Sequence, residues 1–183
     1  MNDLSGKTIL ILATNGFEQS ELDVPHDKMK EAGATVHIVA PEAGEITGWD
    51  QKDWGRAVKV DKTLAEVSAD AYDAIVLPGG QMNPDTLRGT PEALTLIKRF
   101  FEQGKVVAAV CHAPWLLIDT GIAKGRRLTS YNTMKQDMIN AGAMWEDSEV
   151  VTDKGVVTSR KPDDLPAFVA KIIEEGRHER RAA

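Results

Sequence analysis

Four short runs of β-branched and other apolar residues constrain the fold of this chain more than any other feature. They lie at Thr8 to Ala13, Val36 to Val39, Ala74 to Leu77 and Val106 to Val110, and polar residues do not alternate within them. Strands that are buried on both faces have this composition, because helices cover both sides of a parallel sheet. The runs therefore predict a mostly parallel sheet inside an α/β fold.

Segments of helical length separate these runs. One extends from Glu18 to Ala32 and ends at Gly33, and another extends from Pro91 to Gln103 and ends at Gly104. A last helix is predicted from Asp163 to Gly176. Strand and helix alternate, so right-handed crossovers bring the carboxyl ends of the strands to one edge, where such folds bind their ligands.

Two stretches break this alternation. The polar, turn-rich segment from Gly44 to Thr63 and the segment from Glu149 to Ser159, with its turn at Asp153-Lys154-Gly155, both predict antiparallel hairpins. Because 183 residues suit one compact unit and no repeat or linker divides them, the sequence predicts a single domain over residues 1–183.

The charge and cysteine content exclude several classes of protein. A net charge of −6 disfavours nucleic acid as a partner, and the basic cluster Arg177 to Arg181 is interpreted as a solvated helix end. The single cysteine forms no internal disulfide, and no apolar run approaches the ~18 residues that cross a bilayer. With no basic and apolar leader, we expect a soluble cytoplasmic protein without a membrane partner.

That cysteine, Cys111, lies in the stretch AAVCHAPWLL, between a buried strand and a helix that begins near Ala113. A sharp strand-to-helix turn presents its middle side chain at the sheet edge and requires small neighbours, which Ala109 and Ala113 provide. The helix N-terminus and a nearby imidazolium are expected to lower the thiol pKa. A lone cysteine is more often a buried apolar residue, but the position at a strand end favours a nucleophile. The adjacent His112 is either its base, if a carboxylate orients it, or a packed imidazole.

Other residues at the same edge have two interpretations each. Gly79 and Gly80 allow backbone N–H groups to bind an oxyanion, although a tight turn also explains them. Glu18 either stabilises a helix N-terminus or, when protonated, donates a hydrogen bond to the Cys111 sulfur. Trp115 either packs its helix on the core or narrows a substrate cleft.

The motifs GFEQSEL, VLPGG, AAVCHAPWLL and TSRKPDDLPAF, in this order along the chain, resemble the ThiJ/PfpI family and its branch of PfpI-type intracellular proteases and general stress proteins. The resemblance implies a flavodoxin-like three-layer sandwich with a nucleophile elbow. It also implies Cys111 as nucleophile, His112 beside it and Glu18 against the sulfur. The acid that orients the histidine would come from a neighbouring subunit, at Asp85, where the family's archetype has glutamate. A homodimer or higher homo-oligomer is therefore expected.

The expected function is a stress-response cysteine hydrolase in which the Cys111 thiolate attacks a carbonyl group. Its substrate would be a peptide, or methylglyoxal and glycated amines, as in a glyoxalase or deglycase. His112 would transfer protons, while the N–H groups of Gly80 and His112 would stabilise the oxyanion. No metal-ligand spacing or glycine-rich nucleotide motif is present, so neither a metal nor a cofactor is expected.

Two alternatives remain at this stage. A redox-sensing or chaperone-like stress protein would use the same thiol, oxidised rather than catalytic. A glutamine amidotransferase shares the cysteine elbow but needs a histidine and glutamate pair near the C-terminal strands. Arg160 and Pro162 occupy that region and His178 lies in the terminal tail, so this alternative ranks low.

Overall fold

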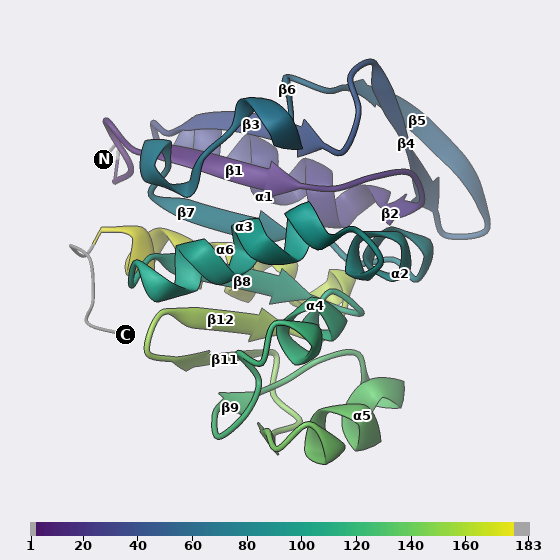
Figure 1. Ribbon diagram of the computed structural model, residues 1–183, viewed down its shortest axis with the longest axis vertical. Coiled ribbons are helices and arrows are strands. Elements are labelled where there is room, and N and C mark those ends of the chain that lie inside the picture. Colours follow the sequence, from purple (N-terminus) through teal and green to yellow (C-terminus); the bar gives the residue numbers. More distant parts are fainter. Residues whose placement is uncertain (1–2, 178–183) are drawn as a thin grey trace.

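A seven-stranded sheet runs through the centre of the computed structural model, which describes residues 3–177 (Figure 1). In spatial order, its strands are β11 (Val150–Asp153), β12 (Val156–Ser159), β8 (Val106–Val110), β7 (Ala74–Leu77), β1 (Thr8–Leu12), β3 (Thr35–Ala40) and β6 (Lys62–Thr63). Neighbouring strands are parallel except for β11 and β12. The four apolar runs are therefore strands of one mostly parallel sheet, which confirms the predicted fold class.

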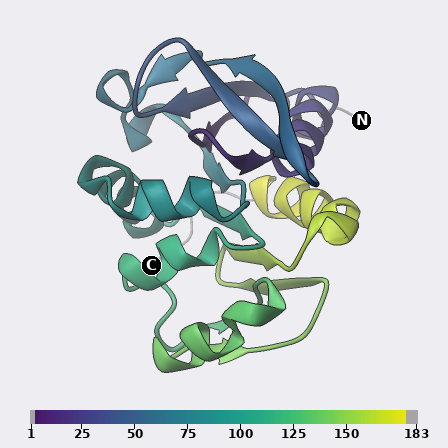
Figure 2. The same cartoon turned by 90° about the vertical axis from the view of Figure 1, so that its right-hand side faces the viewer.

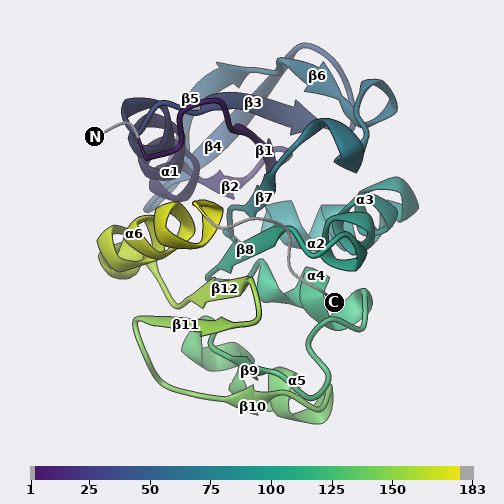
Figure 3. The same cartoon turned by 90° about the vertical axis from the view of Figure 1, so that its left-hand side faces the viewer.

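Helices cover both faces of this sheet (Figure 3). One face carries α1 (Gln19–Glu31) and α6 (Leu165–Gly176), and the other carries α3 (Pro91–Glu102) and α4 (Pro114–Asp119). Successive side chains of a strand point to opposite faces, so each strand contributes to two cores. In β1, Ile11 belongs to the apolar cluster that contains Phe168 of α6, whereas Leu10 belongs to the cluster that contains Phe100 of α3.

Both predicted hairpins are present. Strands β4 (Glu45–Asp50) and β5 (Asp53–Lys59) pair in antiparallel fashion and form a small separate sheet with β2 (Phe17–Glu18). Strands β11 and β12 form the second antiparallel pair. Because β12 also pairs in parallel with β8, this hairpin extends the main sheet next to the strand that leads to Cys111.

Several short elements were not predicted, because they are too short for a periodic pattern. They are the helices α2 (Met82–Arg88) and α5 (Lys135–Asn140), the strands β9 (Arg127–Leu128) and β10 (Met144–Trp145), and the 3-10 turns Leu64–Glu66, Ala69–Ala71, Asn132–Met134 and Pro162–Asp164. The last of these turns occupies the predicted start of the final helix, so α6 begins two residues late.

Figure 2 views the molecule from the side to which the strand arrows of Figure 1 point. At this edge of the sheet, β7 leads into α2 and β8 leads into α4.

Of the predicted basic cluster only Arg177 lies within the described residues, where it pairs with Asp3. Across residues 3–177, no helix combines the length and apolar character needed to cross a membrane.

Candidate active site

Cys111 occupies a strained turn between β8 and α4. Its φ of 63° lies in the left-handed region, which costs a residue other than glycine on the order of 1–3 kcal/mol. Two backbone hydrogen bonds hold the turn: the Cys111 N–H donates to the carbonyl of Ser159 at 3.1 Å, and the Tyr131 N–H donates to the Cys111 carbonyl at 2.8 Å. The strand-to-helix turn predicted at this position is thus present, and β12 fixes it.

The imidazole of His112 lies beside the sulfur. The distance from Cys111 Sγ to His112 Nδ1 is 3.2 Å, and both residues are buried. The imidazole stacks on Tyr131, with ring centroids 4.8 Å apart and planes at 27°, and it contacts Trp115 at 5.1 Å. Burial lowers the pKa of His112, so the ring favours the neutral form that can accept a proton.

The two glycines have different roles. The N–H of Gly79 donates to Glu21 Oε2 at 2.8 Å and is therefore not free for an oxyanion. A Cβ at Gly79 would lie 2.7 Å from the Cys111 Cβ, so only glycine fits. Gly80 has a φ of +77°, and its N–H, like that of His112, is directed at the Cys111 sulfur. Of the donors predicted for an oxyanion, Gly80 and His112 face the sulfur and Gly79 does not.

The prediction that Glu18 contacts the sulfur is wrong. Glu18 is the N-cap of α1, and its Oε2 accepts hydrogen bonds from Ser20 N at 2.7 Å, Ser20 Oγ at 2.7 Å and Glu21 N at 3.3 Å. A carboxylate that caps a helix in this way satisfies the free N–H groups of the first turn. The alternative interpretation, in which Glu18 stabilises the helix N-terminus, is the correct one.

Glu21, three residues further along α1, occupies the place predicted for Glu18. It is fully buried, and its carboxyl group lies beside the Cys111 thiol. Burial, assisted by the negative charge of Glu18, raises the pKa of Glu21 to about 8. The sequence carried a signal for this residue, because Glu21 adjoins the buried stripe formed by Leu22, Pro25 and Met29 on α1.

The pKa of the thiol also differs from the sequence-based prediction. Burial and the negative charge of Glu21 raise the pKa of Cys111, and they outweigh the hydrogen bonds from the N–H groups of Gly80 and His112, which lower it. The predicted imidazolium is disfavoured because His112 is itself buried. The resting pair is therefore a neutral thiol beside a neutral imidazole.

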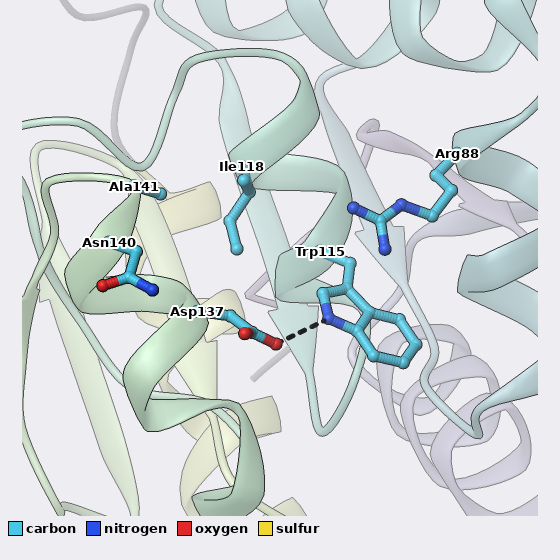
Figure 4. A pocket seen from close by; sticks show the side chains of 6 residues that line it. All are labelled: Arg88, Trp115, Ile118, Asp137, Asn140 and Ala141. Carbon is cyan, nitrogen blue, oxygen red and sulfur yellow. Dashed lines mark hydrogen bonds between the residues drawn. The ribbon is translucent and has the colours of Figure 1, made fainter.

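Asp85 is exposed on α2, and among residues 3–177 the only hydrogen-bond partner of the His112 ring is the Cys111 sulfur. One chain by itself therefore does not bring Asp85 to His112. Trp115 lies beside His112 and borders a cleft of about 410 Å³, which is also lined by Arg88, Ile118, Asp137, Asn140 and Ala141 (Figure 4).

Sequence reasoning missed Tyr131 as well as Glu21. Tyr131 stacks on His112 and also lines a second cleft of about 320 Å³. The other residues that line this cleft are Asn132, Asp147, Arg160 and Lys161. Arg160 bridges Asp147 and Asp164, each at 2.8 Å, so its charge is largely balanced. No pattern in the sequence singles out Tyr131, because it lies in a loop between unrelated short elements.

Several known proteins resemble this chain in sequence or in fold. The profile of the DJ-1/PfpI family matches residues 7–175. "Deglycase PfpI" of Pyrococcus furiosus is 45% identical over 166 residues, which cover 91% of this chain and 97% of that protein. "Putative cysteine protease YraA" of Bacillus subtilis is 44% identical over 163 residues, which cover 88% and 94%. The crystal structure of Drosophila melanogaster DJ-1beta superposes with a TM-score of 0.85 at 31% identity, covering 94% of this chain and 91% of that one.

Proposed function

Because this chain belongs to the DJ-1/PfpI family, we propose that it is a cysteine-dependent enzyme in which Cys111 attacks the carbonyl carbon of its substrate. The observation that carries this proposal is the 3.2 Å distance between Cys111 Sγ and His112 Nδ1 on a strained strand-to-helix turn. Nucleophile and base within hydrogen-bond reach are what covalent catalysis requires.

The first step is a proton-coupled attack. As the bond between sulfur and the carbonyl carbon forms, the thiol proton passes to His112 Nδ1 and the carbonyl π electrons move to oxygen. The N–H groups of Gly80 and His112, which face the sulfur, stabilise the resulting oxyanion. Return of the proton from His112 to that oxygen gives a hemithioacetal when the substrate is an aldehyde.

A small carbonyl compound or the carbonyl group of a glycated amine is the substrate class that we favour over a polypeptide. Cys111 is only 6% exposed, and a compact dicarbonyl such as methylglyoxal needs less space beside a buried sulfur than an extended peptide backbone does. The name of the deglycase from Pyrococcus furiosus supports the same choice. Peptidase activity is the competing possibility, which the protease name given to the Bacillus subtilis relative supports.

The acid that orients His112 is assigned to Asp85 of a second copy of the chain. Asp85 is exposed on α2 and thus available to a partner, and His112 has no carboxylate partner among residues 3–177. A homodimer or larger homo-oligomer would then be required for the complete site. A stress-response role in the cytoplasm is part of the same proposal.

A redox sensor is less well supported. Oxidation of a thiol follows its thiolate character and its exposure. Here burial both hides the Cys111 sulfur and raises the pKa of the thiol. These properties oppose rapid oxidation, while they leave catalysis possible through proton transfer to His112.

A substrate panel tests the proposal. Methylglyoxal, methylglyoxal-treated amines, casein and fluorogenic peptides are assayed with wild type, Cys111→Ser and His112→Ala in buffer free of amines and thiols, which trap aldehydes reversibly. We expect turnover of the carbonyl compounds by wild type alone. Unchanged turnover by Cys111→Ser would rule out the proposed nucleophile, and turnover of casein alone would favour the peptidase.

A further inference from the structure

The indole of Trp115 contacts the imidazole of His112 and also lines the cleft shown in Figure 4. The centroids of the two rings are 5.1 Å apart with planes at 59°, and Tyr131 stacks on the imidazole with a centroid distance of 4.8 Å. His112 is therefore packed against two aromatic rings that come from different parts of the chain. Its one hydrogen bond within residues 3–177, to the Cys111 sulfur, does not by itself fix the ring plane.

Two opposite charges from other helices hold Trp115 in place (Figure 4). The guanidinium of Arg88, on α2, lies 5.3 Å from the centroid of the indole, within the range of a cation–π contact. The indole Nε1 donates to Asp137 Oδ2, on α5, at 3.4 Å. Arg88 is itself oriented by two hydrogen bonds to Asp119, at 2.8 and 3.0 Å. This arrangement joins α2, α4 and α5 around one side chain.

We propose that Trp115 is a positioning residue for His112, and that Arg88 and Asp137 clamp its indole so that the imidazole stays aligned with the Cys111 sulfur and shielded from water. The inference rests on the proposed function, since His112 matters as a base only if Cys111 is a nucleophile. It assigns to the chain itself a part of the orienting role that a carboxylate performs in other cysteine and serine sites. The simpler alternative is that Trp115 only packs α4 against the core.

The two possibilities differ in what happens to the imidazole. If the indole shields His112, its removal admits water, and the pKa of His112 rises from its lowered value toward the ordinary value of ~6.5. If Trp115 only packs its helix, the variant loses stability and the titration of His112 stays in place. The titratable groups around His112 are the Cys111 thiol, the stacked Tyr131, Glu21 behind the thiol, and Arg88 and Asp137 beyond the indole.

The test is an NMR titration of histidine in the full-length protein, which has four histidines, with His112 assigned from the spectrum of His112→Gln. We expect Trp115→Leu to raise the pKa of His112, and Trp115→Phe, which keeps a ring but loses the N–H that Asp137 accepts, to raise it by less. Asp137→Ala, which releases the indole N–H, should shift the pKa in the same direction by less. Trp54→Leu, at an exposed tryptophan on β5, is the matched control and should change nothing.

Each outcome decides the question. A folded Trp115→Leu protein whose His112 titrates as in wild type overturns the proposal. If circular dichroism shows that Trp115→Leu does not fold, Asp137→Ala and Arg88→Gln replace it, and unchanged His112 titration in both overturns the proposal. The titration needs no substrate, so it stands even if the enzymatic function fails. Where turnover is measured, the acid limb of the kcat/KM profile should move with the His112 pKa.

Discussion

The backbone N–H of Gly79 lies 2.8 Å from Oε2 of Glu21, so the glycine pair and the buried carboxyl group form one unit behind the Cys111 sulfur. Glu21 Oε1 is buried and has no hydrogen-bond partner among the described residues, and the Cys111 thiol lies beside the carboxyl group. A carboxyl group in this setting is protonated at neutral pH and can donate to sulfur.

Glu21→Gln should therefore change the pH dependence of stability. Glu21 has a pKa of about 8 in the folded protein, well above the ~4.3 of an unfolded carboxyl group. A raised carboxyl pKa stabilises the fold fully below the unfolded value, and this contribution is lost as the pH rises toward 8. We expect the free energy of unfolding of wild type to fall by several kcal/mol between about pH 4.5 and 8, when it is compared with that of Glu21→Gln at each pH.

Urea unfolding at a series of pH values measures this difference. Glu92→Gln, at an exposed glutamate in the first turn of α3, is the control and should track wild type. A constant difference between wild type and Glu21→Gln across this pH range would contradict the raised pKa of Glu21.

Gly79→Ala should disrupt the site. The added Cβ would lie 2.5 Å from Glu21 Oε2 and 2.7 Å from both the Cys111 Cβ and the Val110 carbonyl. Overpacking of this kind costs about 1–3 kcal/mol, and here it would also displace the sulfur. Gly89→Ala is the matched control, since its nearest contact would be 3.4 Å away. Thermal unfolding and Cys111 alkylation should change in the first variant only.

Alkylation by iodoacetamide reports on Cys111 alone, because it is the only cysteine in the chain. The raised pKa of the thiol predicts a rate that keeps rising with pH beyond ~8.5, the ordinary value for cysteine. Glu21→Gln removes the nearby negative charge and should move the curve to lower pH. Glu18→Ala, at the helix cap, should cost about 1 kcal/mol of stability and move the curve much less. A plateau near pH 6 in wild type would instead indicate a thiolate at neutral pH.

Mixing two inactive variants tests the origin of the acid. If Asp85 acts across a subunit boundary, Asp85→Ala and Cys111→Ala should each be inactive alone. In a co-refolded mixture of symmetric dimers, about a quarter of the sites would combine an intact Cys111 with an intact partner Asp85. Activity recovered only after mixing supports the proposal, whereas full activity of Asp85→Ala alone removes this residue from the mechanism.

Much of the fold could be predicted from the sequence, because buried strands have a composition that few other elements share. The position of Cys111 at the end of β8 followed from the same pattern. The same pattern could not decide whether Glu18 or Glu21 lies beside the Cys111 sulfur. Both carboxylates lie near the start of α1, and only the actual first residue of the helix decides which one caps it and which one turns inward.

The pKa values and the role of Tyr131 depend on burial and on loop geometry. The sequence suggested a helix N-terminus that would acidify the thiol, but α4 has only six residues and the surrounding side chains exclude water. Tyr131 reaches His112 from a loop that precedes a 3-10 turn, and a local pattern contains no information about such a contact.

The left-handed backbone of Cys111 sets activity and stability against each other at one position. Glycine adopts this conformation without a steric penalty, so Cys111→Gly would relieve strain that Cys111→Ser retains. A search for thermostable variants of this chain would then tend to select against its own reactive centre. Retention of a side chain at residue 111 in such a selection would show that the packing of this side chain outweighs the relief of backbone strain.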